Sequence, residues 1–136
     1  MAKVLGVVET GVYVDDLDRA EAFYSRILGL ELLAREAGRH IFYRVGADNV
    51  LLVFRPQASL VGETLPPHGA SGPGHFALGI PAEELDAWRD RLTAEGVAIE
   101  HEQAWPRGGR SLYFRDPAGN SVELITPGVW GLPSGW

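Results

Sequence analysis

The sequence predicts an α+β fold of two tandem βαβββ modules, each forming a half-barrel sheet, within a single domain of 136 residues. Three observations predict it. Two short segments alternate between apolar and polar residues, each is followed by apolar residues at helical spacing, and two later segments align with each other without a gap. Because helices are expected to cover one face of each sheet, the opposite faces are left to enclose a pocket.

The first strand of each module is predicted from alternation. Residues 9–14 place Thr10, Val12 and Val14 on one face, and residues 75–80 place apolar residues in the same way. The opposite faces carry small or polar residues, as expected for a pocket wall: Glu9, Gly11, Tyr13, His75, Ala77 and Gly79.

A helix is predicted after each strand. The first begins at aspartates 15, 16 and 18, which can cap it, and ends at Gly29. The second begins with two glutamates at 83 and 84, carries an apolar stripe, and ends at Gly96. The apolar residue after each glycine, Leu30 or Val97, is expected to open the next strand.

The later strands carry the strongest internal similarity. Residues 41–54 align with residues 112–125, so that Arg44 matches Arg115 and Asn49 matches Asn120. Each segment predicts a hairpin with a turn rich in Gly, Asp, Asn or Pro. The modules are therefore expected at 5–56 and 74–127, joined by a Pro/Gly/Ser-rich linker at 57–73 and followed by a tail at 128–136.

Composition narrows the possible functions. The formal net charge of −6 disfavours a nucleic-acid or acidic-membrane partner, because both call for clustered basic residues. With no cysteine, disulfides and thiolate chemistry are excluded, and any metal must be held by His, Asp or Glu. The apolar segment from Val4 to Val8 is too short for a signal peptide or a membrane span, so a cytoplasmic location is expected.

Broken symmetry in the repeat singles out a candidate metal site. Glu9 and His75 occupy the same place on the first strands, whereas Leu52 and Glu123 occupy the same place on the last strands. An imidazole and two carboxylates, from Glu9, His75 and Glu123, can hold one divalent ion such as Fe, Mn, Ni or Zn. The alternative is a hydrogen-bonded structural histidine, with a polar partner for each glutamate.

Three motifs resemble the vicinal oxygen chelate superfamily: Tyr13 to Leu30, Gly-His-Phe-Ala at 74–77, and Phe-Arg-Asp-Pro-Ala-Gly-Asn-Ser-Val-Glu-Leu at 114–124. That group includes glyoxalase I, extradiol dioxygenases, fosfomycin-resistance enzymes and bleomycin-binding proteins. The resemblance implies paired βαβββ modules, often swapped in a homodimer, and a divalent metal on the inner sheet surface at Glu9, His75 and Glu123. The chain departs from the pattern at Glu9, where histidine is usual, and at Leu52, where glyoxalase I has a fourth ligand.

The pocket lining follows from alternation. Tyr113 can donate a hydrogen bond to a substrate oxygen, although a half-buried strand tyrosine explains it as well. The loop from Trp105 to Arg110 can close over an anionic substrate, or be an ordinary exposed loop. The remaining residues expected to bind substrate are Tyr13, His40, Phe42, Arg44, Trp105, Arg107, Arg110 and Ser111.

Two main functions stay open. One is a metal-dependent enzyme in which the ion polarises vicinal oxygens of a small substrate, with Glu9 or Glu123 also able to act as a base in lyase, isomerase or dioxygenase chemistry. The other is a metal-free protein that sequesters an aromatic or drug-like ligand. A degenerate member with a structural role is a third possibility. A homodimer is expected, with Trp130 and Trp136 of the tail packing on a partner. Glu9 can meet His75 and Glu123 within one chain or across two.

Overall fold

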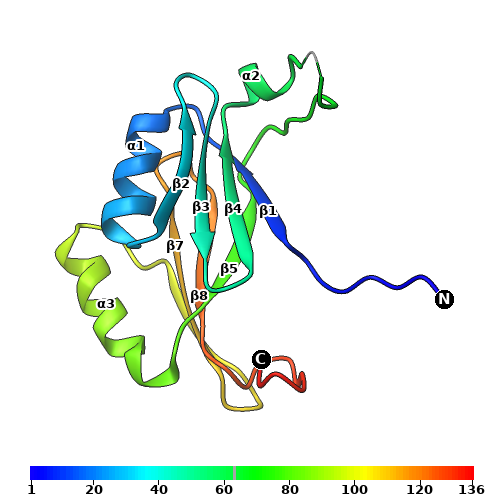
Figure 1. The fold of residues 1–136 in the computed structure, drawn as a ribbon. Helices are drawn as coiled ribbons and strands as arrows, with labels where there is room; N and C mark the ends of the chain where they lie inside the picture. The colour runs from blue at the N-terminus through cyan, green and yellow to red at the C-terminus, as the bar shows by residue number, and fades with distance from the viewer. Residues whose placement is uncertain (63) are drawn as a thin grey trace. The chain divides into compact units, whose positions relative to one another are not determined.

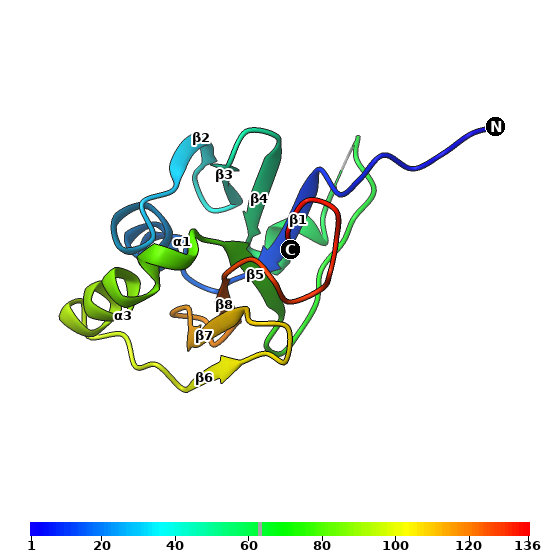
Figure 2. The ribbon, with the colours of Figure 1, turned by 90° about the horizontal axis from the view of Figure 1, so that it is seen from below.

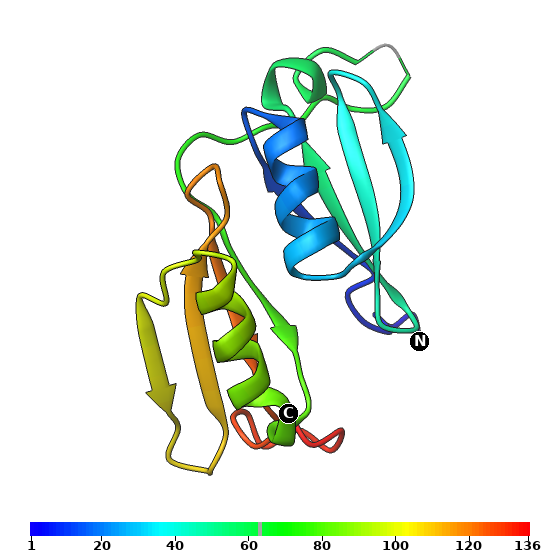
Figure 3. The same ribbon diagram turned by 90° about the vertical axis from the view of Figure 1, so that its left-hand side faces the viewer.

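The computed structural model describes residues 1–62 and 64–136 and divides into two compact units, Met1–Gly72 and Pro73–Trp136. Residue 63, inside the predicted linker, lies outside the described residues. Each unit contains one four-stranded mixed sheet and a helix along one of its faces (Figures 1 and 3). The predicted α+β fold of two tandem βαβββ modules is confirmed.

The sheet of the first unit has the order β1-β4-β3-β2. Its strands are β1 (Glu9–Tyr13), β2 (Glu31–Glu36), β3 (His40–Val45) and β4 (Asn49–Phe54). β1 runs parallel to β4, and the other pairs are antiparallel. On the helix-covered face, Ile41, Tyr43, Leu51 and Val53 are almost fully buried, because alternate residues of each strand point to that face.

The helix of the first unit differs from the single α-helix that the sequence predicts. α1 (Leu17–Glu21) is capped by Asp16, whose carboxylate accepts from the Arg19 N–H at 3.1 Å. It continues as a π-helix (Ala22–Ile27), in which the adjacent Phe23 and Tyr24 are both buried. Gly29, with φ of +70°, ends it as predicted. A short helix, α2 (Pro56–Ser59), overlaps the start of the predicted linker.

The sheet of the second unit has the order β5-β8-β7-β6. Its strands are β5 (His75–Gly79), β6 (His101–Ala104), β7 (Arg110–Arg115) and β8 (Ser121–Ile125). A 3₁₀ turn (Ala82–Glu84) leads into α3 (Leu85–Ala94). β6 begins four residues later than predicted, because the Val97 N–H still bonds back to the Leu92 carbonyl at 2.9 Å and belongs to the helix end.

The two registers are equivalent, as the repeat predicts. Gly11 pairs with Leu52 in the first sheet, and Ala77 pairs with Glu123 in the second. Leu52 and Glu123 therefore occupy matching positions on the faces that the helices leave open. At the N-terminus, the exposed residues 1–8 lead away from β1 (Figure 2). Across the described ranges, no helix has the length and apolar character that a bilayer crossing requires.

Candidate functional site

His75 and Glu123 meet on the open face of the second sheet. They lie on the neighbouring strands β5 and β8, and the distance from His75 Nε2 to Glu123 Oε1 is 3.3 Å. The Glu123 side chain is 7% exposed, whereas that of His75 is 51% exposed. A nearly buried carboxylate beside an accessible imidazole leaves the pair open to a ligand on one side.

The second ring nitrogen fixes the orientation of His75. Nδ1 is 3.1 Å from the backbone oxygen of Ser121 and 3.2 Å from its hydroxyl. A carbonyl oxygen only accepts, so Nδ1 carries a proton; when the ring holds only that proton, its lone pair is at Nε2, on the side of Glu123. That arrangement suits a metal-ligating histidine, whose other nitrogen commonly donates to a backbone carbonyl.

The distance between the two donor atoms also fits a shared cation. Ligands about 2.1 Å from one ion, at angles between octahedral and tetrahedral, lie roughly 3.0–3.4 Å apart. The same 3.3 Å separation fits an ion pair between Glu123 and a doubly protonated imidazole. Within residues 1–62 and 64–136, no three His, Asp or Glu side chains gather as a metal-binding cluster. The second unit therefore supplies two donors.

A chain of hydrogen bonds holds the other oxygen of Glu123. The Ser111 hydroxyl donates to Glu123 Oε2 at 2.5 Å, and the Trp105 indole N–H donates to the Ser111 oxygen at 2.9 Å. Ser111 is completely buried. Sequence alternation placed Ser111 on this face, but the contribution of Trp105 carried no periodic signal.

The turn from Asp116 to Asn120 sets the register between β5 and β8. One Asp116 oxygen accepts from the N–H groups of Ala118 and Asn120, at 3.0 and 2.9 Å. The Asn120 side chain in turn accepts from the Gly74 N–H at 2.8 Å. Both polar residues are nearly buried, and their bonds place His75 opposite Ser121 and hence beside Glu123.

Tyr113 lies on β7 directly opposite Glu123, as alternation predicts. Burial raises the pKa of its hydroxyl, and the neighbouring Glu123 carboxylate raises it further. The Tyr113 ring is stacked near His75, with 6.2 Å between ring centroids, and it also contacts the ring of His101. A neutral hydroxyl here can donate a hydrogen bond into the open face.

The segment from Trp105 to Arg110 forms a hydrogen-bonded turn. The Trp105 N–H donates to the Gly109 carbonyl at 2.8 Å, and the Gly108 N–H donates to the Trp105 carbonyl at 3.0 Å. Arg110 pairs with Glu102, which also binds Arg89. Arg107 lies against Gly131 of the tail. Two of the three arginines predicted to bind substrate, Arg107 and Arg110, thus contact groups of their own unit.

The C-terminal tail reaches the open face of the second sheet. The indole of Trp136 packs so closely on Gly79 that a Cβ at this glycine would overlap the ring. Gly79 shares its face with His75, four residues earlier along β5, because side chains two or four residues apart on a strand point to the same side. Part of the face beside the His75–Glu123 pair is therefore covered by a residue of the tail.

In the first unit, the open face carries partly exposed aromatic rings. His40 and Phe42 stack with centroids 4.0 Å apart, and Phe42 meets Phe54 edge to face. The Tyr13 hydroxyl hydrogen-bonds His68 Nδ1 at 2.6 Å, and the His68 ring packs on Phe54. His68 carries no signal in the sequence, because it lies outside any periodic segment. We call these five residues the aromatic face.

Glu9, the third predicted ligand, lies at the start of β1 in the first unit and is exposed. It sits opposite Val50, the counterpart of Ser121. Arg44, predicted to bind substrate, donates to the Gly46 carbonyl at 3.0 Å and pairs with Glu31 across the strands. Arg44 is thereby held at the hairpin end of the sheet.

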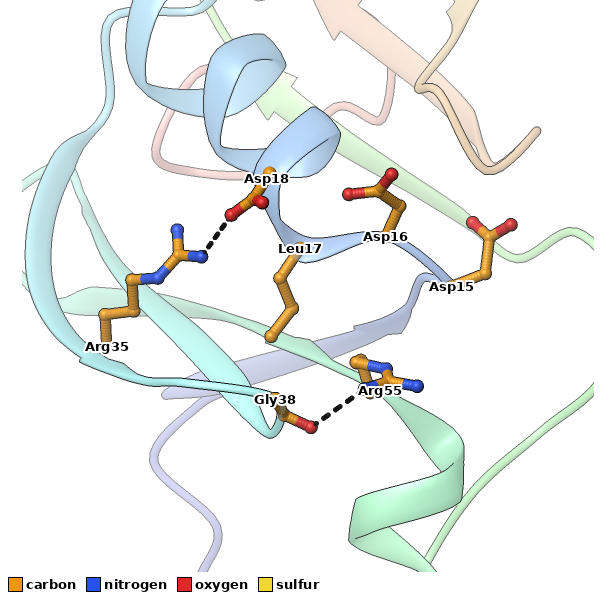
Figure 4. Close-up of a pocket in the computed structure, with 7 residues that line it drawn as sticks. All are labelled: Asp15, Asp16, Leu17, Asp18, Arg35, Gly38 and Arg55. Carbon is orange, nitrogen blue, oxygen red and sulfur yellow. Dashed lines mark hydrogen bonds and ion pairs between the residues drawn. The ribbon is translucent and has the colours of Figure 1, made fainter.

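A hollow of about 360 Å³ lies elsewhere in the first unit, at the start of α1 (Figure 4). It is lined by three aspartates, Asp15, Asp16 and Asp18, and two arginines, Arg35 and Arg55. Arg35 pairs with Asp18 at 2.6 Å, and Arg55 donates to the Gly38 carbonyl at 3.5 Å. None of the predicted site residues lines this hollow, and one of its two arginines is already paired with one of its aspartates.

Two βαβββ units, with a histidine–glutamate pair on an open sheet face, define a class of small α+β proteins. The chain belongs to the Glyoxalase/Bleomycin resistance protein/Dioxygenase superfamily, which matches residues 6–124. The family that the motifs suggested is confirmed.

Several relatives are lyases by name. A crystal structure of lactoylglutathione lyase from Agrobacterium tumefaciens is 41% identical, with a TM-score of 0.90, and the match covers 96% of this chain and 99% of that one. A lactoylglutathione lyase of Arabidopsis thaliana is 32% identical over 124 residues, covering 85% of this chain and 42% of that protein. This chain thus spans less than half of the Arabidopsis relative. The metallothiol transferase FosB of Bacillus licheniformis is 26% identical over 129 residues, covering 94% of this chain and 79% of FosB.

Proposed function

We propose that the protein is a metal-dependent enzyme that binds one divalent ion through His75, Glu123 and Glu9 and acts on a small substrate with adjacent oxygens. The observation that carries the proposal is the 3.3 Å approach of His75 Nε2 to Glu123 Oε1 on an open sheet face. Glu9 supplies the third donor, from the same chain or from the second chain of a homodimer. When bound, the ion supplies Lewis-acid polarisation of the substrate oxygens.

The side chains of the second unit have separate roles in this proposal. His75 is held by Ser121 with its lone pair toward the site, and Glu123 contributes a negative charge from a nearly dry position. Tyr113, opposite Glu123, donates a hydrogen bond to a substrate oxygen, since its raised pKa keeps the hydroxyl protonated at neutral pH. Glu9, being exposed, is suited to exchange a proton with substrate as a general base.

For the reaction class we propose lyase or isomerase chemistry. The support is the 41% identity to a structure described as lactoylglutathione lyase. Leu52 stands where glyoxalase I has its fourth ligand, so the proposed ion has three protein ligands and more positions for substrate. Glutathione-linked substrates are therefore one candidate class, and small molecules with vicinal oxygens are the broader one.

Metal analysis of the untagged protein tests the proposal. Protein incubated with excess Mn²⁺, Ni²⁺ or Zn²⁺ and then freed of unbound metal is expected to retain about one ion per chain, as measured by plasma mass spectrometry. His75→Ala should lose the ion. His101→Ala is the matched control, because His101 also lies near Tyr113 but its Nε2 bonds the Gln103 side chain rather than a carboxylate. Wild-type protein that retains no ion, or equal retention by both variants, would contradict the proposal.

A second function is favoured by the aromatic face. Its rings, from Tyr13, His40, Phe42, Phe54 and His68, are partly exposed and offer stacking surface to a planar ligand. A metal-free protein that sequesters an aromatic ligand would use this face and would not need the His75–Glu123 pair. Ligand binding that is unchanged in His75→Ala and in the presence of chelator would favour this function.

A further inference from the structure

We propose that Ser111 and Trp105 are positioning residues for the candidate metal site: they lock the Glu123 carboxylate so that Oε1 faces His75. This inference rests on the proposed function, because it concerns the same site. It adds two residues that act through Glu123 and that do not themselves touch the ion.

The direction of the hydrogen bonds is fixed by chemistry. An indole N–H can only donate, so Trp105 must donate to the Ser111 oxygen, 2.9 Å away. An ionised carboxylate can only accept, so the single Ser111 proton must point to Glu123 Oε2, 2.5 Å away. Trp105 therefore uses Ser111 as an acceptor and leaves the Ser111 proton for Glu123, beside which Tyr113 also lies.

Burial makes this chain of bonds hard to replace. Ser111 is 0% exposed and the Glu123 side chain is 7% exposed, so water has little access to the Oε2 side. With Oε2 held, rotation of the carboxylate would break a charge-assisted bond, which is stronger than a bond between neutral groups. Oε1 is thus presented to Nε2 of His75 before any ion arrives.

The first unit provides an internal comparison. The positions that match Ser111 and Glu123 are His40 and Leu52, because the strand registers are equivalent. His40 stacks on Phe42 there and its pKa is lowered, mainly by burial. At this strand position, the half of the repeat that carries the carboxylate has a buried serine and the other half has a histidine, as expected if the serine serves that carboxylate.

Titration with Mn²⁺ tests the inference, with wild type, Ser111→Ala, Trp105→Phe and Thr126→Val compared by calorimetry. Ser111→Ala is expected to raise the Kd about 10- to 100-fold, as for other residues that orient metal ligands. Trp105→Phe removes only the N–H donor and should raise it by a smaller factor. Thr126→Val is the control: it removes another buried hydroxyl, which bonds the Arg110 N–H rather than Glu123. Its Kd should match wild type.

A measurement without metal separates positioning from general damage. In the apo protein, the Trp105 indole proton should shift in the NMR spectrum when Ser111 is replaced by Ala, and it should stay in place in Thr126→Val. If wild type binds Mn²⁺ and Ser111→Ala binds it equally well, the positioning role is overturned while the metal site stands. If wild type binds no ion, the metal proposal falls, and the positioning role falls with it. Equal weakening by Ser111→Ala and Thr126→Val would also overturn the positioning role.

Discussion

Replacing Glu123 by Gln should separate metal binding from stability. The amide oxygen can still accept from Ser111, and the amide N–H can donate to the lone pair at His75 Nε2, so the shape and hydrogen bonds of the apo site are kept. A charge-assisted bond becomes a neutral one, and the apo protein should lose about 1 kcal/mol of unfolding free energy. The anionic donor to the metal is lost entirely.

The magnitude of the metal effect follows from mass action. At a free metal concentration 100 times the Kd, binding to the folded state adds about 2.7 kcal/mol to the unfolding free energy. For a chain of this length, about 1 kcal/mol corresponds to roughly 3–5 °C in Tm. Wild type should therefore melt about 8–14 °C higher with metal than with chelator, and Glu123→Gln should show almost no such shift.

Leu52→Ala is the matched control for this experiment, because Leu52 holds the place of Glu123 in the first sheet. Leu52 is only partly buried, so its loss should cost less than about 2 kcal/mol, below the range for a fully buried leucine. Its thermal shift with metal should equal that of wild type. A full metal shift in Glu123→Gln, or a lost shift in Leu52→Ala, would refute the assignment of Glu123 as a ligand.

Three further predictions concern stability and charge. Asn120→Ala removes the acceptor of the Gly74 N–H and should lower the unfolding free energy by about 1–3 kcal/mol in urea; no change would show that the turn does not hold β5. The pKa of Glu102 is lowered, chiefly by its hydrogen bond to Arg89. The ionised Glu102 therefore stabilises the folded protein at pH values above the ordinary glutamate pKa of 4.5, and this stabilisation is lost as the pH falls through the lower pKa of the folded state. Glu102→Gln should therefore lower the unfolding free energy by up to about 1 kcal/mol at pH 7, and by progressively less below pH 4.5. Unfolding curves at several pH values measure this difference, and a difference between variant and wild type that does not change with pH would contradict the prediction. His40 should titrate below pH 6.5 by NMR, because burial lowers its pKa, and a value above 6.5 would show that this desolvation is absent.

Much of the fold was predictable because strand alternation and a gapless repeat are local signals. A period of two residues assigned Glu123 and Tyr113 to the open face of their sheet. The repeat identified Leu52 as the counterpart of Glu123 in the first sheet. The turn from Asp116 to Asn120 was predicted from its Asp, Pro, Gly and Asn residues. The hydrogen bond from the Gly74 N–H to the Asn120 side chain was not predicted. The pairing of His75 with Glu123 followed from the same alignment.

The remaining features depend on contacts that leave no periodic trace. The π-helical segment is set by packing of adjacent Phe23 and Tyr24, which an α-helical spacing does not indicate. The bond from Trp105 to Ser111 comes from a turn, and His68 comes from a segment that was predicted only as a linker. Such partners are selected by three-dimensional proximity, so a single sequence does not reveal them.

The placement of Trp136 has a practical consequence for measuring metal content. Gly79 holds the place that Tyr13 holds in the first sheet, and the indole from the tail fills the space where a ring would otherwise lie. Any residues attached after Trp136 therefore begin beside the face that carries His75 and Glu123. A polyhistidine extension at that end would start close to the candidate site and bring extra imidazoles to it, so a metal count or a thermal shift measured on such a protein would report the extension as well as the site.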